Sequence, residues 1–297
     1  MIPIIDITPL VSMGAKQEGV VNEIRNACET VGFFYVIGHG ISLDIQTNIF
    51  STARDFFALP EHVKHGVGVA KSRCFRGYVP FALTGPNVPK RMLEAFQMML
   101  DFGPDDPDVA VGNIMYGSNQ WPADAPRMRA ILEAYYKEME TLSNYLLSAF
   151  ARALGEDPEF FNTYYQKPMT QLRLLHYPYV ESDNLEDQQG VEAHTDTGAF
   201  TILMQDDISG LEIRARDGNW LAATPIDDAF VINVGDMMQW WTAYRFISTP
   251  HRVTNRSGRS RYSVPFFVNP DRSAVINQLG VDPDDSGAKF EVGAHVE

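Results

Sequence analysis

Leu172-Arg173-Leu174-Leu175-His176-Tyr177 is the first of several short runs that decide the fold of this chain. The runs are rich in residues that favour β-strands, and turn sequences such as Asp217-Gly218-Asn219 and Ser257-Gly258 separate them. Short, closely spaced strands favour an antiparallel sandwich or barrel over a sheet built from βαβ units. The further runs are residues 200–204, 211–215, 230–234, 251–254 and 262–268.

The chain before these runs has a different pattern. Apolar residues recur at spacings of three and four from Met128 to Phe150, which predicts a long amphipathic helix that covers a larger body. The first 60 residues predict a strand, a helix, a second strand at 33–37 and a second helix capped by Ser42. Residues 61–120 show no clear pattern, and no linker interrupts the chain.

We therefore predict an α+β protein with a mainly β core. An N-terminal α/β lobe spans residues 1–120, and a helix followed by the β core spans residues 121–297. We expect the two parts to pack as one unit.

Composition narrows the class of partner. The 297 residues carry a formal net charge of -14, which argues against nucleic acid or an anionic membrane as the partner and favours a small molecule. Two cysteines make no disulfide framework, and neither a signal peptide nor a membrane span is evident. We expect a cytoplasmic protein that is a monomer or a weak oligomer.

A candidate metal site lies within the β region. In an extended strand, His194 and Asp196 project from one face, and the later His251 would complete a set of two imidazoles and one carboxylate. Such a set leaves coordination positions open, as in non-haem Fe(II) oxygenases. A structural zinc site would favour cysteine ligands, and no cysteine is near. His-x-Asp alone is a weak pattern, so the ordered set with the later Arg261 carries the hypothesis.

Motifs along almost the whole chain resemble the isopenicillin N synthase-like family of Fe(II)/2-oxoglutarate-dependent dioxygenases. They occur in the order typical of that family. The motifs are Ile2-Pro3-Ile4-Ile5-Asp6, Gly32-Phe33-Phe34-Tyr35-Val36-Ile37-Gly38-His39-Gly40, Arg76-Gly77-Tyr78, Leu172-Arg173-Leu174-Leu175-His176-Tyr177-Pro178, His194-Thr195-Asp196, Gly235-Asp236-Met237-Met238-Gln239, His251-Arg252-Val253 and Arg261-Tyr262-Ser263-Val264-Pro265-Phe266-Phe267.

This resemblance implies a double-stranded β-helix (jelly roll) that holds Fe(II) in its open end. The implied activity is oxidation, chiefly hydroxylation, of a C–H bond of a small molecule in specialised metabolism. Dioxygen and 2-oxoglutarate would be cosubstrates, with release of succinate and carbon dioxide. The implied iron ligands are His194, Asp196 and His251, and the residues implied to bind 2-oxoglutarate are Arg261, Ser263 and Tyr177.

The resemblance also implies a substrate pocket drawn from the N-terminal lobe and from the strand after Arg-x-Ser. The candidates are Arg76, Tyr78, Met98, Phe200 and Phe267. The chain departs from many plant members in having Leu175 in place of an asparagine. It also ends soon after residues 282–285, so we expect a small or missing C-terminal lid.

Two alternatives stay open at this point. Isopenicillin N synthase keeps the triad and Arg-x-Ser but uses no 2-oxoglutarate, so a 2-oxoglutarate-independent oxidase or cyclase would share the pattern. A non-enzymatic β-sandwich module with a structural metal would instead need a fourth protein ligand. His176 is the nearby histidine for that role, although strand alternation directs it away from Leu175 and Tyr177.

Overall fold

Two β-sheets form the centre of the molecule, and residues of both sheets contribute to one apolar cluster between them. The computed structural model describes residues 1–81, 92–179, 189–281 and 289–293 of the chain. The large sheet has the order β1-β2-β10-β7-β12-β5-β4-β3, and the small sheet has the order β6-β11-β8-β9. These sheets agree with the predicted jelly-roll core. The strands are β1 (Ile4–Asp6), β2 (Phe33–Ile37), β3 (Gly77–Val79), β4 (Glu94–Met99), β5 (Gln171–Tyr177), β6 (Gln189–His194), β7 (Phe200–Gln205), β8 (Leu211–Arg214), β9 (Trp220–Ala222), β10 (Phe230–Val234), β11 (His251–Thr254), β12 (Arg261–Val268), β13 (Val275–Asn277) and β14 (Lys289–Glu291).

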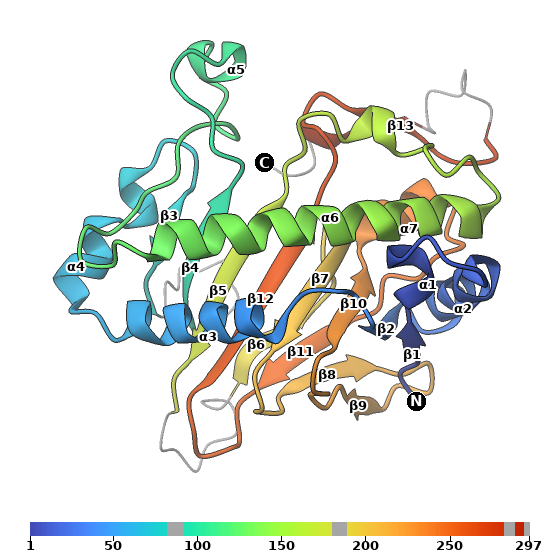
Figure 1. The fold of residues 1–297 in the computed structure, drawn as a ribbon, viewed down its shortest axis with the longest axis horizontal. Helices are drawn as coiled ribbons and strands as arrows, with labels where there is room; N and C mark the ends of the chain where they lie inside the picture. The colour runs from blue at the N-terminus through green and yellow to red at the C-terminus, as the bar shows by residue number, and fades with distance from the viewer. Residues whose placement is uncertain (82–91, 180–188, 282–288, 294–297) are drawn as a thin grey trace.

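Helices cover the outer face of the large sheet. The predicted long helix is α6 (Met128–Leu154), which crosses that face in Figure 1, and its buried apolar side chains belong to the larger apolar cluster. Gly155 ends it in the left-handed conformation at φ 88°. The predicted Ser42 cap is present, because its hydroxyl accepts the Ile45 N–H at 3.3 Å. The other helices are α1 (Thr8–Val11), α2 (Gln17–Thr30), α3 (Leu43–Phe57), α4 (Glu61–Gly66), α5 (Pro107–Ala110), α7 (Asp236–Trp241) and the 3₁₀ turns η1 (Val69–Lys71) and η2 (Asn162–Tyr164).

The N-terminal strands extend the large sheet at both of its edges. Strands β1 and β2 lie at one edge, and β4 and β3 lie at the other. Both β3 and β4 fall in the region 61–120, which showed no pattern in sequence. Strand β4 is buried on both faces for most of its length, so the alternation of polar and apolar residues that marks a half-buried strand is absent. The boundary between the two lobes stays a prediction.

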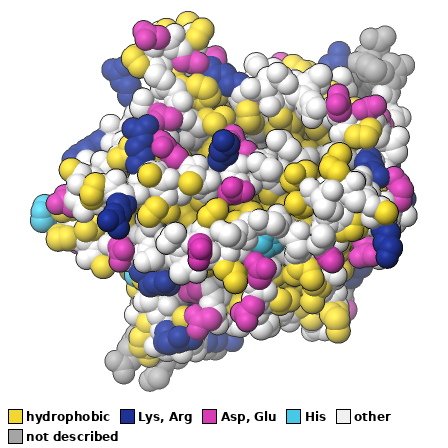
Figure 2. Space-filling model, viewed as in Figure 1, with side chains coloured by type: hydrophobic (Ala, Val, Ile, Leu, Met, Phe, Trp, Pro, Cys, Tyr) yellow, Lys and Arg dark blue, Asp and Glu magenta, His cyan; other side chains and the backbone are white. Residues whose placement is uncertain are grey.

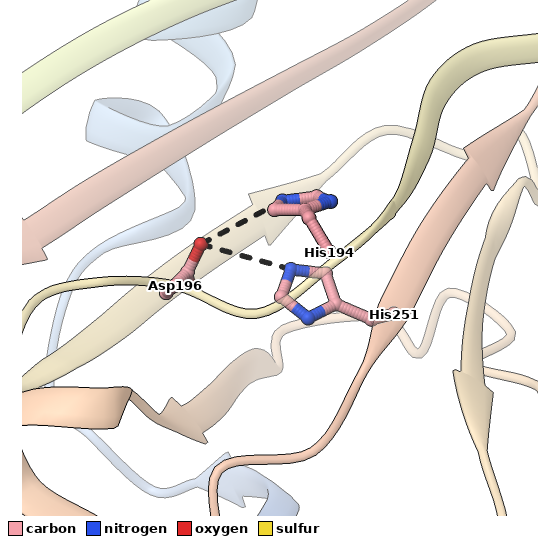
Figure 3. Close-up of side chains that lie close together, drawn as sticks. All are labelled: His194, Asp196 and His251. Atoms are coloured by element: carbon pink, nitrogen blue, oxygen red, sulfur yellow. Dashed lines mark ion pairs between the residues drawn. The ribbon is translucent and has the colours of Figure 1, made fainter. Parts of the chain in front are cut away.

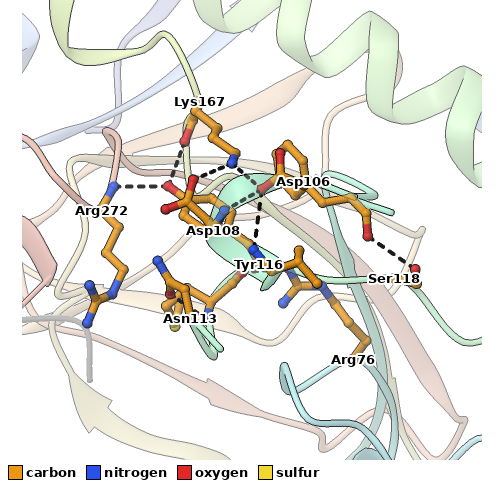
Figure 4. A network of polar contacts seen from close by, with 11 residues as sticks. Arg76, Asp106, Asp108, Asn113, Tyr116, Ser118, Lys167 and Arg272 are labelled. Carbon is orange, nitrogen blue, oxygen red and sulfur yellow. Dashed lines mark hydrogen bonds and ion pairs between the residues drawn. The ribbon is translucent and has the colours of Figure 1, made fainter. Parts of the chain in front are cut away.

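The segment between β4 and α6 that carries α5 is held against the core by charged contacts (Figure 4). The Lys167 ammonium binds the carboxylates of Asp106, at 2.6 Å, and Asp108. The Tyr116 hydroxyl donates to the Lys167 carbonyl at 3.0 Å. The segment that carries α5 is therefore held against the residues that lead into β5.

The surface on the α6 side mixes acidic and basic side chains (Figure 2). Cys28 and Cys74 are both free and buried. No described helix is long and apolar enough to cross a membrane. The residues on which the C-terminal lid would depend, 282–288 and 294–297, lie outside the described residues.

Candidate active site

Three side chains from distant parts of the sequence face one another between the sheets (Figure 3). Asp196 Oδ1 lies 3.7 Å from His194 Nε2 and 3.8 Å from His251 Nε2. The two imidazole ring centroids are 4.3 Å apart, and one ligand atom from each residue lies within 4.8 Å of the others. One cation among these atoms can contact all three.

Strand pairing places the two histidines. His194 ends β6, His251 begins β11, and the two residues are direct partners across the antiparallel pair. Asp196 lies beyond the end of β6, which corrects the expectation that both His194 and Asp196 project from one strand. The carbonyl of Asp196 accepts the Asp236 N–H at 2.7 Å, and this bond holds the turn.

Hydrogen bonds determine which atoms remain for a metal. The Nδ1 atoms of His194 and His251 lie 2.8 Å and 3.2 Å from the carbonyl oxygens of Glu192 and Thr249. A bond to a carbonyl requires a protonated Nδ1, so each Nε2 offers its lone pair toward Asp196.

The two oxygen atoms of the Asp196 carboxylate have different partners. Its Oδ2 atom accepts the Thr201 hydroxyl at 2.6 Å and the Asn233 amide at 2.7 Å. Its Oδ1 atom is the one that faces both histidines. The protein thus fills one oxygen and aims the other at the centre of the triad.

The protonation states also suit a metal. Burial alone would raise the pKa of the Asp196 carboxyl, but His251 and the donors Thr201 and Asn233 hold this pKa below its ordinary value. Burial lowers the pKa of the His251 imidazole. A carboxylate with two imidazoles is the ligand set of the non-haem Fe(II) facial triad, so these residues fit Fe(II).

Arg261 lies in the wall of the same cavity and is fully buried. Its Nε atom donates to the Ile208 carbonyl at 3.2 Å, and its Nη2 atom donates to the Gln205 side chain at 2.8 Å. Its Nη1 atom has no hydrogen-bond partner among the described residues. A buried charged donor without an acceptor is unfavourable, so the arrangement suits an anion in the cavity.

Ser263 and Tyr177 border the same end of the cavity. Arg261 and Ser263 are two residues apart on β12, so they share a face. Tyr177 is the partner of Arg261 on β5, and its ring centroid lies 5.0 Å from the guanidinium carbon. The three side chains predicted to bind 2-oxoglutarate therefore lie together.

A glycine lets the Arg261 side chain take this position. A Cβ atom at Gly210 would lie 2.4 Å from the Thr254 carbonyl oxygen and 3.2 Å from Arg261 Cδ. A larger residue would force the backbone or the guanidinium away. Neither Gly210 nor Gln205 was predicted from sequence, because the roles of both depend on how separated strands pack.

The cavity has a volume of about 320 Å³ and takes its walls from both sheets. Leu175 lines it, as do the residues on either side of the candidate metal site. The described lining comprises Phe33, Leu93, Gln171, Arg173, Leu175, Tyr177, Val191, His194, Thr195, Asp196, Thr197, Gly198, Thr201, Leu203, Leu211, Asn233, His251, Val253, Arg261, Ser263, Pro265, Phe267 and Asn269.

His176 does not join the triad. Its Nδ1 atom lies 2.7 Å from Glu94, and its ring stacks on Tyr262 at a centroid distance of 4.6 Å. It is absent from the described lining of the cavity. The fourth ligand that a closed structural metal site would need is therefore not supplied by His176.

Of the predicted substrate residues, Phe267 lines the cavity and four do not. The Arg76 guanidinium is buried and donates to the carbonyls of Cys74 and Met115. The four residues that this finding corrects are Arg76, Tyr78, Met98 and Phe200.

The other three corrected residues also face away from the cavity. The Tyr78 hydroxyl donates to Glu94 at 2.6 Å. Met98 belongs to the apolar cluster on the helix side of the sheet, and Phe200 packs against Phe150 of α6 at 5.2 Å.

Phe200 was wrongly predicted to line the pocket because the sequence does not show which face of β7 its alternate residues occupy. Neighbouring residues point to opposite faces, so Phe200 faces the helices while Thr201 faces the cavity. Thr201 and Asn233, which hold Asp196, were not among the predicted site residues. Parity within residues 200–204 could have indicated Thr201, but the pairing of Thr201 with Asn233 across β7 and β10 could not be read from sequence.

Comparisons with known proteins agree with this geometry. Residues 2–124 match the family model described as "non-haem dioxygenase in morphine synthesis N-terminal", and residues 168–270 match that of the 2OG-Fe(II) oxygenase superfamily. Clavatol oxidase of Penicillium crustosum is 34% identical over 310 residues, which cover 98% of this chain and 92% of that protein. A 2-oxoglutarate-dependent dioxygenase of Monascus ruber is 38% identical over 305 residues, which cover 96% and 90%.

Similar solved structures include one with 2-oxoglutarate bound. A Neurospora crassa protein in complex with alpha-KG, which is 2-oxoglutarate, and thymine has a TM-score of 0.85 at 27% identity, over 99% of this chain and 95% of that one. Together these matches favour the 2-oxoglutarate-dependent alternative over the oxidase without cosubstrate and the non-enzymatic module. The chain belongs to the 2OG-Fe(II) oxygenase superfamily and is an Fe(II)- and 2-oxoglutarate-dependent dioxygenase.

Proposed function

We propose that His194, Asp196 and His251 are the Fe(II) ligands of this dioxygenase. The observation that carries the proposal is the convergence of Asp196 Oδ1 with two Nε2 atoms whose rings are oriented by backbone carbonyls. Three protein ligands leave positions for a cosubstrate and dioxygen.

We propose further that Arg261, Ser263 and Tyr177 bind the carboxylate of 2-oxoglutarate that is remote from iron. The support is the buried Nη1 donor of Arg261, which faces no protein acceptor among the described residues. Arginine offers a planar pair of donors that match a carboxylate. Tyr177 packs against the guanidinium and limits its movement.

The reaction we propose is hydroxylation of a C–H bond of a small molecule. When Fe(II), 2-oxoglutarate and dioxygen are bound, the metal centre supplies the oxidising power that removes a hydrogen atom, and 2-oxoglutarate leaves as succinate and carbon dioxide. Thr201 and Asn233 keep Asp196 in one orientation. Apolar walls that include Phe267 exclude water and position the C–H bond.

A role in specialised metabolism is part of the proposal. Its support is the similarity to the clavatol oxidase of Penicillium crustosum. The cytoplasmic location and the monomeric or weakly oligomeric state stay predictions, as does the expectation that nucleic acid and membranes are not partners.

Succinate formation tests the assignment. The wild-type enzyme should release succinate from 2-oxoglutarate in the presence of Fe(II) and dioxygen, and an accepted substrate should raise the rate. Asp196→Ala should remove this release because the metal loses its only carboxylate ligand in the triad. Unchanged release by Asp196→Ala would contradict the assignment.

A further inference from the structure

The two histidines of the triad differ in what surrounds their rings. The side chain of His194 is 38% exposed, and its Nδ1 atom bonds to the carbonyl of Glu192 within its own strand, β6. The side chain of His251 is 9% exposed, and its Nδ1 atom bonds to the carbonyl of Thr249. Thr249 precedes β11 and belongs to no described strand or helix. The orientation of His251 therefore depends on what holds residues 247–249 in place.

The turn between α2 and β2, near the N-terminus of the chain, holds this segment. The Thr249 hydroxyl donates to the Val31 carbonyl at 2.7 Å. Gly32 has a φ of 71°, and a Cβ atom there would lie 2.0 Å from the Ile247 carbonyl oxygen. Glycine allows both the left-handed conformation and the close approach. The turn is therefore packed directly against the segment whose carbonyl accepts the bond from His251.

Phe33, the first residue of β2, contacts the ring of His251 itself. The two ring centroids are 5.3 Å apart at an interplanar angle of 67°, which is an edge contact. Phe33 is buried in the cavity wall and is the direct strand partner of Asn233, which donates to Asp196. An edge contact between aromatic rings is favourable, and it limits rotation about the histidine χ2 angle, which otherwise has a broad range.

We propose that Phe33 and Thr249 are positioning residues for the metal ligand His251, so that the start of β2 is part of the metal site. This inference rests on the proposed function, because it assumes that His251 binds Fe(II). Thr249 fixes the direction of Nδ1 through its carbonyl, and Phe33 restricts rotation of the ring. The Nε2 atom is then directed at Asp196 in the metal-free protein. Metal binding therefore requires less ordering of this ligand.

Two neighbouring phenylalanines of β2 give a matched test. Phe34 is as buried as Phe33 but belongs to the apolar cluster on the helix side of the sheet. Calorimetric titration of the full-length, metal-free protein with Mn(II) measures affinity, and denaturant unfolding without metal measures stability. We expect Phe33→Leu to weaken Mn(II) binding about three- to tenfold, the range for an aromatic pair. Phe34→Leu should lose comparable stability but keep its Mn(II) affinity within a factor of about two.

Two substitutions at Thr249 separate its hydrogen bond from its packing. Thr249→Val removes the donor to the Val31 carbonyl and keeps the shape of the side chain, whereas Thr249→Ser keeps a hydroxyl and loses a methyl group. We expect Thr249→Val to weaken Mn(II) binding about three- to tenfold, the range for one neutral hydrogen bond. Thr249→Ser should bind Mn(II) as tightly as the wild type, which a loss of packing alone would not predict. This pair decides the test if Phe33→Leu does not fold.

A folded Phe33→Leu or Thr249→Val protein that binds Mn(II) as tightly as the wild type would overturn the inference. An equal loss of affinity in Phe34→Leu or Thr249→Ser would also overturn it, because the cause would then be general loosening of the structure rather than the orientation of His251. Failure of the proposed function is read separately from His251→Ala. That variant should lose most of its Mn(II) affinity, and wild-type affinity in it would contradict the assignment of His251 as a ligand.

Discussion

Two polar clusters lie on opposite sides of the large sheet and are built from similar residues. The cavity cluster consists of His194, Asp196, His251 and Arg261. The helix-side cluster lies between the sheet and helices α3 and α4, and consists of Lys64, Tyr78, Glu94 and His176. Each cluster has a carboxylate, imidazole and a cation, so composition alone does not separate a site from a structural contact.

The use of the carboxylate oxygens separates them. In the helix-side cluster, Glu94 Oε1 lies 2.7 Å from His176, and Oε2 lies 2.8 Å from the Lys64 ammonium and 2.6 Å from the Tyr78 hydroxyl. Both oxygens of Glu94 are therefore bound by protein groups. In the cavity cluster, the protein binds one oxygen of Asp196 and directs the other at two imidazole nitrogens.

The difference shows how a closed cluster is distinguished from a binding site. A buried charge whose hydrogen bonds are all made within the protein contributes to the folded structure. A buried ligand atom or donor that faces a cavity, such as Asp196 Oδ1 or Arg261 Nη1, is built for a group that comes from solution. Mutations should therefore separate the clusters: one set should affect turnover, and the other should affect stability.

Asp196→Ala should have the largest effect on turnover. Without its carboxylate the triad retains two neutral ligands, and substrate-dependent succinate release should fall to background. Unfolding measured by denaturant should change far less than turnover, because the buried carboxylate no longer has to be desolvated. An Asp196→Ala protein that does not fold would contradict the expected difference, in which mutations of the cavity cluster affect turnover and mutations of the helix-side cluster affect stability.

Arg261→Gln should have the next largest effect. Loss of a charged hydrogen bond corresponds to about 1.5–3 kcal/mol, so the KM for 2-oxoglutarate should rise about ten- to a hundredfold while Mn(II) affinity is retained. Steady-state kinetics over a range of 2-oxoglutarate concentrations measures the change. An unchanged KM would show that Arg261 does not bind the carboxylate of 2-oxoglutarate.

Thr201→Val should act through Asp196 rather than on the reaction directly. Removal of one of the two donors to Oδ2 should weaken Mn(II) binding about tenfold to a hundredfold, the range for groups that orient metal ligands. Calorimetric titration of Mn(II) measures the affinity independently of activity. Equal affinity in the wild type and the variant would mean that Asn233 alone orients the carboxylate.

Glu94→Gln should have the smallest effect on turnover and a clear effect on stability. Burial opposes ionisation of Glu94, but the bonds from His176, Lys64 and Tyr78 lower its pKa from 4.5 to about 2. Because the folded pKa lies below the unfolded one, the contribution of Glu94 to stability is complete above about pH 4.5 and is lost as the pH falls toward 2. That contribution is about 3 kcal/mol.

Denaturant unfolding of wild type and Glu94→Gln from neutral to acidic pH measures this effect. The difference in free energy of unfolding should be greatest near neutral pH and should shrink in acid. Mn(II) affinity should stay within a factor of about two, since the helix-side cluster contacts none of the proposed ligands. A difference in free energy of unfolding that is constant with pH would mean that these neighbours do not lower the pKa of Glu94.

Much of the fold could be predicted because local pattern and tertiary role agree. The periodicity from Met128 gave α6, and the apolar run at residues 33–37 gave β2. Prediction failed where tertiary contacts override the local pattern. Strand β4 is buried on both faces and contains Glu94, whose charge is balanced by residues that the sequence does not place beside it.

The candidate site divides in the same way. The iron ligands and Arg-x-Ser were recognisable because their types and spacing reflect coordination and anion chemistry. The groups that orient them, Asn233 and Gln205, depend on which strands are neighbours, so spacing along the chain gives no indication of them. The residues that line the substrate side of the cavity were the least predictable part. Neighbouring residues of a strand point to opposite faces, so an error of one position places Phe200 in the cavity instead of Thr201.

The central claim is that the cavity cluster, and not the helix-side cluster, holds Fe(II) with 2-oxoglutarate. Anaerobic addition of both to the wild type, Asp196→Ala and His176→Gln tests this most directly by the visible charge-transfer band of the complex. We expect the band in the wild type and in His176→Gln and its absence from Asp196→Ala, with circular dichroism showing that each protein is folded. A band retained by Asp196→Ala, or lost from folded His176→Gln, would contradict the claim.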